Sequence, residues 1–271
     1  MDQTAERAEA RTSEVALSVI LPVYNEVDSL PVLWQELAAV LPRVAPSAEV
    51  IFVDDGSTDG SADVIRRLAL GDDRIRLLRF EKNAGLSAAF HAGFQAARGC
   101  LVATMDSDLQ SDPGDLVTLI AHLDGADAVV GWRQIRHDSW LKRISSRVAN
   151  GIRKAMTGDT LQDSACSLRV MRRECLAAVP PFAGLHRFIP TLIRLDGYRV
   201  VQVPVHHRAR QFGRSKFGVS NRALPAFMDL LAVLWMMRRR LRYRIAEQIG
   251  FAERGAGRTE ARRELVRGGR E

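Results

Sequence analysis

A regular alternation of short apolar runs and longer segments of helical periodicity dominates the first half of this sequence and restricts its fold class. The apolar runs are Leu17–Leu21, Val50–Val53, Ile75–Leu78, Leu101–Met105 and Ala128–Val130. Such short runs, rich in β-branched residues, are typical of buried strands. Helix-like segments separate them, at Leu30–Val40, Ala62–Ala69 and Leu86–Ala97. This alternation predicts an α/β fold with a mainly parallel central sheet and helices on both of its faces.

Polar residues directly follow three of the predicted strands. The segments are Pro22–Glu26, Asp54–Ser57 and Asp106–Asp108. Ligands of open parallel sheets bind beyond the carboxyl ends of the strands, and we expect the three segments to meet there. The sequence therefore predicts a single binding pocket at that edge of the sheet.

The pair Asp106 and Asp108, separated by one serine, is the most informative part of these segments. Side chains at positions i and i+2 of an extended chain point to the same side, so the two carboxylates repel each other unless a cation lies between them. A hard divalent ion accepts oxygen ligands and keeps positions for a diphosphate. A solvated acidic turn that caps a helix near Pro113 is the common alternative for these residues taken alone.

The three segments together favour a nucleotide diphosphate as the ligand. A carboxylate of the second segment can accept the N–H of a nucleobase, and the ring of Tyr24 can lie on the face of the base. The residues themselves leave open whether Asp54 or Asp55 meets the base.

Five stretches give the sequence its likeness to a known family: LPVYNE at 21–26, VDDGSTDGS at 53–61, MDSDLQ at 105–110, GWR at 131–133 and RQFGRSK at 210–216. In this order they resemble the family 2 glycosyltransferases that transfer sugars to polyprenyl phosphates. Within that group the sequence is similar to dolichyl-phosphate mannosyltransferases, bactoprenol glucosyltransferases and the aminoarabinose transferase of lipid A modification. The resemblance extends from about Leu17 to about Trp235.

The resemblance implies the GT-A fold and an inverting transfer of a hexose from a UDP- or GDP-sugar to undecaprenyl or dolichyl phosphate. It also implies Mg²⁺ or Mn²⁺ as the cofactor, held at Asp106, Asp108 and Gln110, and a role in cell-envelope glycan or lipid modification. The implied nucleotide-sugar site consists of Pro22, Tyr24, Glu26, Val53, Asp54, Asp55, Asp106, Ser107 and Asp108. The family pattern favours Asp55 over Asp54 as the contact with the base.

The resemblance also implies that three cations bind the acceptor phosphate, namely Arg133, Arg210 and Lys216. Together with Asp106 and Asp108 they form the implied catalytic set. The chemistry agrees, because a phosphate monoester is already a dianionic nucleophile near neutral pH and needs cationic positioning more than a general base. Weaker candidates for the same phosphate lie in a basic helix expected over 140–156, at Lys142, Arg143 and Ser146. A basic amphipathic helix lying on a membrane is the alternative interpretation of that segment.

One segment departs from the family pattern. Residues 163–169 read DSACSLR, and relatives usually have glycine at the position of Ala165, where close approach to the sugar would explain it. We expect Cys166 to be a small buried residue rather than a nucleophile. The neighbouring histidines His206 and His207 would point to opposite faces of a strand, and we assign them no chemistry.

Positive charge is concentrated at the C-terminal end of the chain. Residues 208–271 carry 16 Lys and Arg against 6 Asp and Glu, whereas the whole chain has a net charge of +7. The apolar segment Leu224–Met237 precedes a cluster of arginines and is shorter than the roughly 20 residues that cross a bilayer. We expect a basic amphipathic helix over 219–248 that binds an anionic membrane surface at the inner face of the cytoplasmic membrane. A small membrane protein is an alternative partner that would supply further helices.

The other expected parts of the chain are a disordered leader over 1–14, a catalytic domain over 15–218 and a polar basic tail over 249–271. Three cysteines without zinc-site spacing, and a leader without an apolar core, favour a reducing cytoplasm. Two other functions stay open: a transferase of the same fold with a soluble or saccharide acceptor, and a non-catalytic protein that binds a membrane or a nucleic acid. Acidic strand ends would repel a phosphate backbone, so we expect no nucleic-acid partner.

Overall fold

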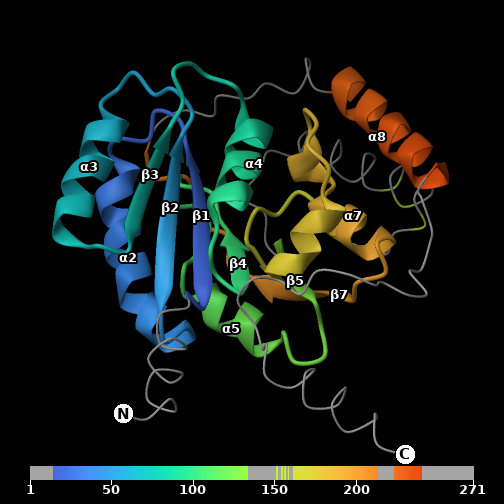
Figure 1. The fold of residues 1–271 in the computed structure, drawn as a ribbon, viewed down its shortest axis with the longest axis horizontal. Coiled ribbons are helices and arrows are strands. Elements are labelled where there is room, and N and C mark those ends of the chain that lie inside the picture. The colour runs from blue at the N-terminus through green and yellow to red at the C-terminus, as the bar shows by residue number, and fades with distance from the viewer. Residues whose placement is uncertain are drawn as a thin grey trace, which may run out of the picture. The chain divides into compact units, whose positions relative to one another are not determined.

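The computed structural model of the chain describes residues 15–133, 151, 154, 156, 158, 161–212 and 223–239 (Figure 1). The chain divides into two compact units, residues 1–237 and 238–271, and the elements described below belong to the first unit, except that its last helix ends at Arg238. The expected leader, the expected tail and nearly all of the basic segment 140–156 lie outside the described residues.

A seven-stranded sheet forms the centre of the first unit, in the order β3-β2-β1-β4-β6-β5-β7. Its strands are β1 (Leu17–Val23), β2 (Ala48–Asp54), β3 (Ile75–Arg79), β4 (Leu101–Thr104), β5 (Ala128–Arg133), β6 (Arg169–Arg172) and β7 (Val200–Val205). β6 runs antiparallel to β4 and β5, while the other neighbouring strands pair in parallel. The predicted mainly parallel sheet is confirmed. The sequence pattern does not predict β6, because two arginines enclose only two apolar residues there.

Helices follow most strands. They are α2 (Ser29–Val44), α3 (Ser61–Gly71), α4 (Leu86–Ala96), α5 (Asp115–Ala121), α7 (Ile189–Leu195) and α8 (Ala223–Arg238), with the 3₁₀ turns η1 (Arg173–Ala178) and η2 (Leu185–Arg187). The three helices predicted in the first half are confirmed. The first of them continues four residues beyond its predicted end at Val40 and includes Pro42.

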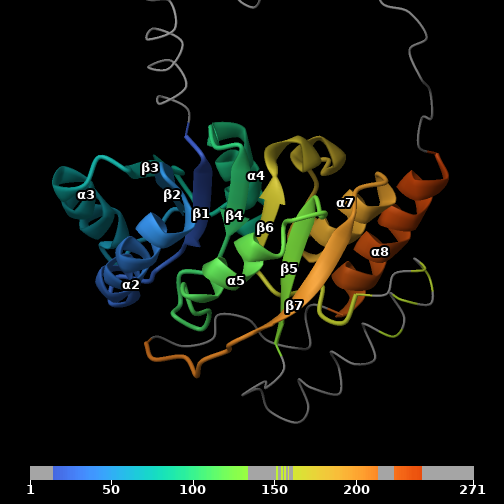
Figure 2. The same ribbon diagram turned by 90° about the horizontal axis from the view of Figure 1, so that it is seen from below.

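The sheet is buried on both faces, as its continuous apolar strands predict. Along β1, Val19 and Leu21 pack into one hydrophobic cluster, whereas Ile20 packs into another. The first cluster takes in α2, α3 and α5, and the second takes in α4, α7 and α8. Figure 2 shows α2 and α5 on one side of the sheet and α4 and α7 on the other. The prediction of helices on both faces is confirmed.

This topology brings six strand ends to one edge of the sheet. All strands except β6 run in the same direction, so their carboxyl ends lie together, and the antiparallel β6 begins at that edge. Arg169, the first residue of β6, therefore lies opposite Thr104 of β4 and Val130 of β5.

The last helix, α8, occupies part of the predicted segment 219–248, of which residues 219–222 and 240–248 lie outside the described residues. The structure divides its apolar residues between two sides. Leu230 and Val233 are buried in the second cluster, while Met228 and Trp235 are exposed. Among the described residues, no helix is both long enough and apolar enough to cross a membrane.

Candidate active site

Hydrogen bonds join the three polar segments at the carboxyl edge of the sheet. The backbone N–H of Asn25 donates to Ser57 Oγ over 2.9 Å, and the Asn25 side chain accepts the N–H of Thr58 over 2.8 Å. The hydroxyl of Ser107 donates to the carbonyl of Pro22 over 2.7 Å. The structure thus brings together the three segments that are predicted to meet at this edge.

Asp55 fixes the loop that leads into α4. Its carboxylate accepts the backbone N–H groups of Ala84 and Gly85 over 2.6 and 2.9 Å, and the side-chain amide of Asn83 over 3.0 Å. Burial raises the pKa of Asp55 above its ordinary value, against the opposing effect of these N–H groups. The side chain implied to contact the base therefore also holds the wall of the site in place.

Asp54 is completely buried and acts within the fold. One carboxylate oxygen accepts the N–H of Ser57 over 3.0 Å, and Arg79 Nε lies 3.3 Å from the other. The next residue, Gly56, has a φ of 71°, and a Cβ there would lie 2.6 Å from the backbone of Lys82. The acidic turn thus needs a glycine where it crosses the loop after β3. Of the two neighbouring aspartates, only Asp55 retains any exposure at the site.

Asp106 and Asp108 lie in the loop after β4, within electrostatic range of each other. Burial raises the pKa of Asp108 to about 6, the charge of Asp106 adds to this rise, and Arg210 opposes it. Leu109 adopts a φ of 61°, which turns the chain so that the N–H of Gln110 donates to Asp108 Oδ1 over 3.1 Å. Asp108 is therefore held, close to Asp106, in a place that disfavours its negative charge.

Arg210, from the segment after β7, supplies a positive charge at this point. Its guanidinium contacts the Asp108 carboxylate and lies 3.4 Å from Glu26 Oε1. The first residue of the R-x-x-G-x-S-K stretch thus reaches two of the predicted nucleotide-sugar residues. Lys216 of the same stretch, like the weaker candidates Lys142, Arg143 and Ser146, lies outside the described residues.

A set of contacts that the sequence does not reveal holds Arg210 in position. The backbone N–H of Arg208 donates to the carbonyl of Gln110, and its guanidinium lies 2.7 Å from Glu36 of α2 and 2.8 Å from Asp112. These partners are far from Arg208 in the sequence, and no spacing pattern indicates them. Arg208 ties the chain after β7 to the loop that carries Asp106 and Asp108.

His206 strengthens the same connection. Its backbone N–H and its Nδ1 contact the two carboxylate oxygens of Asp115 over 2.8 and 2.7 Å. The hydrogen bond to Asp115, followed by the charge of that residue, raises the pKa of His206. No sequence pattern indicates this contact of His206 with Asp115.

Arg133, at the end of β5, is held by a carboxylate. Its Nε and Nη2 donate to the two oxygens of Asp163 over 2.7 and 3.1 Å, and both side chains are largely buried. Burial tends to lower the pKa of Arg133, but the hydrogen bonds and charge of Asp163 outweigh it and raise the pKa. Two of its donor groups are therefore occupied by the protein.

Arg169 is a second buried cation at this edge. It is 2% exposed, and its Nη2 donates to the carbonyl of Cys166 over 2.6 Å, whereas its Nε has no hydrogen-bond partner in the described part of the chain. Burial lowers its pKa to about 10, while the charges of Asp106 and Asp163 oppose this shift. Its positive charge thus offsets part of the acidity of the site.

The segment that departs from the family pattern is accommodated without strain. Ala165 has no positive φ, and its N–H donates to Asp163 Oδ1 over 3.2 Å. Cys166 is 3% exposed, and burial raises the pKa of its thiol to about 11. It is a small buried residue with little thiolate character, as expected.

Comparisons with known proteins identify the family of the chain. Residues 18–179 match the family described as glycosyl transferase family 2. A dodecaprenyl-phosphate galacturonate synthase of Rhizobium johnstonii is 37% identical over 233 residues, which cover 83% of this chain and 68% of that protein. An undecaprenyl-phosphate 4-deoxy-4-formamido-L-arabinose transferase of Edwardsiella ictaluri is 37% identical over 220 residues, covering 80% and 67% of the two chains.

Solved structures support the fold. The crystal structure of glucosyl-3-phosphoglycerate synthase from Mycobacterium tuberculosis, in complex with Mn²⁺, UDP and glucosyl-3-phosphoglycerate, superposes with a TM-score of 0.62 at 22% identity. The match covers 87% of this chain and 84% of that one. This likeness shows the fold, and the matched family with the two relatives shows that the chain belongs to glycosyl transferase family 2.

Proposed function

We propose that this glycosyltransferase transfers a hexose, with inversion, from a UDP- or GDP-sugar to polyprenyl phosphate, for cell-envelope glycan or lipid modification. The observation that carries the proposal is the meeting of Asp106 and Asp108 with Arg210 at one edge of the sheet. The acidic pair suits a metal and a diphosphate, and the arginine suits a phosphate acceptor. Two relatives at 37% identity are named for dodecaprenyl phosphate and undecaprenyl phosphate.

The donor set at Asp106 and Asp108 fits Mg²⁺ or Mn²⁺. Both groups are carboxylates, and their mutual repulsion contributes to the raised pKa of Asp108, so a cation between them would stabilise both charges. The described residues contain no cluster of three or more His, Cys, Asp or Glu side chains placed to hold a metal. Mg²⁺ is commonly held by one or two carboxylates together with substrate phosphates. When bound here, the ion would neutralise the charge that develops on the diphosphate leaving group.

Residues that follow β1 would orient the nucleoside part of the donor, next to Asp106 and Asp108. Tyr24 is 36% exposed at the end of β1, where its ring can lie against the base. Glu26 is held by the hydroxyl of Ser29 and by Ser61, whose Oγ accepts the Glu26 N–H. These contacts give the nucleoside side of the site a fixed shape before a ligand arrives, which favours productive positioning.

The reaction needs little proton transfer at the acceptor. A phosphate monoester is dianionic near neutral pH, and one of its oxygens can form the new bond to the anomeric carbon. The bond from that carbon to the diphosphate breaks in the same displacement, and the electron pair leaves with the nucleoside diphosphate. A single displacement inverts the anomeric configuration. Arg210, with Lys216, would hold the acceptor against an anionic donor.

Arg133 acts differently in this proposal. Because Asp163 occupies its Nε and one Nη2 hydrogen bond, the guanidinium has a fixed orientation. Its remaining donors can still bind a phosphate oxygen, and the fixed orientation favours a phosphate that arrives from one direction. We place the reaction at the inner face of the cytoplasmic membrane, where the lipid acceptor would lie.

A transfer assay tests this function. Purified protein is incubated with Mn²⁺, undecaprenyl phosphate and a series of radiolabelled UDP- and GDP-sugars, and label is counted in the organic phase. We expect label from one donor, its loss in Asp108→Asn, and unchanged transfer in Asp63→Asn, a matched change on the exposed side of α3. Failure with every donor, in a protein that still binds a nucleoside diphosphate, would favour a soluble acceptor or a required membrane partner and overturn the proposal.

A further inference from the structure

Helix α8 is apolar on more sides than the protein covers. One side packs into the second hydrophobic cluster, where Leu230 is 5% exposed and Val233 is fully buried. On the other side four large apolar residues are exposed: Phe227 at 43%, Met228 at 56%, Leu231 at 37% and Trp235 at 60%. A helix that is apolar all round is normally buried all round, yet in the described part of the chain these four side chains of α8 stay exposed.

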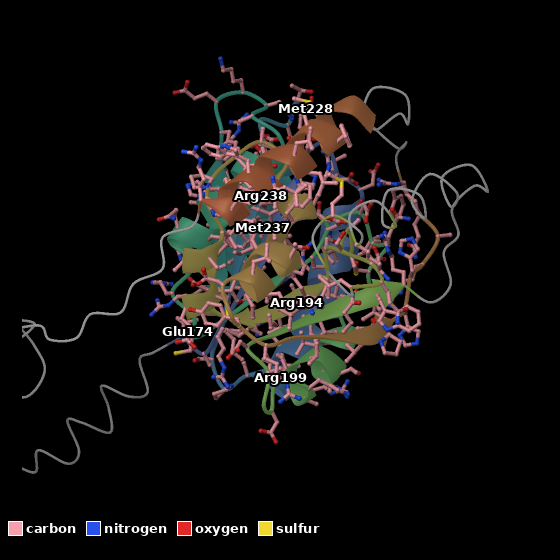
Figure 3. The ribbon with its side chains drawn as sticks, turned by 90° about the vertical axis from the view of Figure 1, so that its right-hand side faces the viewer. Glu174, Arg194, Arg199, Met228, Met237 and Arg238 are labelled. Atoms are coloured by element: carbon pink, nitrogen blue, oxygen red, sulfur yellow. The ribbon has the colours of Figure 1, made fainter. Side chains whose placement is uncertain are left out.

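The four exposed residues, which we call the outer stripe of α8, form one row. Phe227, Leu231 and Trp235 are spaced by four residues, which places them above one another on a single helical face, and Met228 adjoins them. Figure 3 looks onto α8, with Met228 near one end and Arg238 at the other. Scattered apolar residues are common on protein surfaces, whereas a continuous apolar row usually marks a binding surface.

Polar contacts fix which side of α8 faces outward. Asp229, the acidic residue of the helix, pairs with Arg187 over 2.9 Å. The same carboxylate lies so close to Gly184 that a Cβ there would be 2.2 Å from Asp229 Oδ2. Rotating α8 to bury the outer stripe would break this pair and expose Leu230 and Val233. The outward face is therefore a property of the fold.

The sequence next to the stripe is strongly basic. Arg238 ends α8 and is exposed, and the chain continues with arginines at 239, 240, 242 and 244. An apolar row that ends in a tryptophan and is followed by arginines matches the boundary between acyl chains and anionic headgroups. A stable protein partner would need about 20–30 residues a side, far more than this row offers.

We propose that the outer stripe of α8 docks the protein on the surface of an anionic phospholipid bilayer. This inference rests on the proposed function, because an acceptor with a polyprenyl tail must be reached at a bilayer. Phe227, Met228, Leu231 and Trp235 enter the boundary of the headgroups and acyl chains, and the basic sequence that follows favours an anionic surface over a neutral one.

Vesicle co-sedimentation of the full chain tests the docking surface. The variant replaces three outer residues, Met228→Gln, Leu231→Gln and Trp235→Gln, since glutamine keeps helix propensity. The matched control is Leu70→Gln, because Leu70 is 89% exposed on α3. On vesicles of phosphatidylcholine and phosphatidylglycerol we expect the triple variant to lose at least about tenfold in partition coefficient, and the control to match the unmodified chain.

A second measurement separates docking from the reaction itself. Transfer of sugar to a short, water-soluble prenyl phosphate should be equal in the unmodified chain, the triple variant and the control, since none of the changed residues lies at the site. Equal transfer with reduced vesicle binding supports the docking surface. If the unmodified chain transferred no sugar to the soluble prenyl phosphate, that result would instead count against the proposed function.

Three results would overturn the inference. The unmodified chain could stay in the supernatant with anionic vesicles. The triple variant could sediment as the unmodified chain does, which would assign binding to the basic residues alone. The unmodified chain could fail to bind vesicles and instead form a dimer that the triple variant cannot form. That result would show that the outer stripe binds a second copy of the chain.

Discussion

The guanidinium of Arg210 forms an ion pair with the carboxylate of Asp108. A residue proposed to bind the acceptor phosphate therefore contacts a residue proposed to bind the metal ion. A divalent ion that binds Asp108 must compete with this arginine. Competition of this kind would link the two halves of the reaction, because the bound ion would release Arg210 toward the acceptor phosphate. The contact can be tested in the absence of any sugar donor.

Replacing Arg210 by methionine should tighten the binding of Mn²⁺ to the protein alone by about tenfold, since a charge pair that competes for Asp108 is removed. Electron paramagnetic resonance measures the Mn²⁺ affinity directly. Sugar transfer should fall strongly in the same variant because the acceptor loses a cation. Arg66→Met, which breaks an exposed pair with Asp63, is the control and should change neither quantity. Equal or weaker Mn²⁺ binding in Arg210→Met would show that the arginine does not compete.

The pair of Arg133 and Asp163 gives a prediction about stability. Asp163→Asn leaves the largely buried Arg133 without a counter-charge, and such a loss costs about 3–5 kcal/mol. The double variant Arg133→Met with Asp163→Asn removes both charges and should recover part of this free energy of unfolding. Urea denaturation of the three proteins provides the values. Both variants should transfer sugar more slowly than the unmodified protein.

A different result for the double variant would change the interpretation of this pair. If the double variant were less stable than Asp163→Asn alone, Arg133 would stabilise the fold through contacts other than Asp163. If the double variant transferred sugar at the normal rate, Arg133 would have no part in orienting the acceptor.

The sequence predicts the sheet well where a strand is marked by its own local residue pattern. Short apolar runs locate β1 to β5, and the polar residues behind three of them locate the edge that becomes the candidate site. Parallel strands bring such residues together whatever the loop lengths between them, which explains why this part is accessible to sequence reasoning. The sequence does not predict β6, because its four residues carry no strand pattern of their own and are buried by the neighbouring strands β4 and β5.

The sequence predicts the individual roles at the site less well. Asp55 is implied as a contact with the base, yet its carboxylate also holds the loop at Ala84 and Gly85, about thirty residues away. Arg208 forms ion pairs with Glu36 and Asp112, and no local sequence pattern connects these three residues. Such contacts depend on which segments the fold brings side by side, so one sequence cannot reveal them.

The packing of α4 on β1 depends on Gly93. A Cβ at this position would lie 2.4 Å from Cγ2 of Ile20, a side chain that is itself fully buried. Gly93→Ala should therefore destabilise the protein by about 1–3 kcal/mol, because the core has no room for the added methyl group. Gly71→Ala is the control, since nothing lies within 4 Å of its added Cβ. Thermal unfolding compares the two, and equal melting temperatures would contradict the close packing.

The contact between His206 and Asp115 predicts a titration. The Asp115 carboxylate raises the pKa of His206, so the folded protein should bind the imidazole proton more tightly than the unfolded chain. The contribution of this pair to stability is therefore fully present below the ordinary histidine pKa and is lost as the pH rises through the higher folded value. Two further charged groups act on this histidine: Asp112 also raises its pKa, and Arg208 lowers it.

Proton NMR can follow the ring of His206 during a pH titration, and Asp115→Asn should move its midpoint down toward the value of about 6.5 for an unperturbed histidine. Since His206 and Arg208 together connect the chain after β7 to α5 and α2, Asp115→Asn should also weaken the hold on Arg210 and lower sugar transfer modestly. A midpoint of His206 that is the same with and without the Asp115 charge would show that the two side chains are apart in solution.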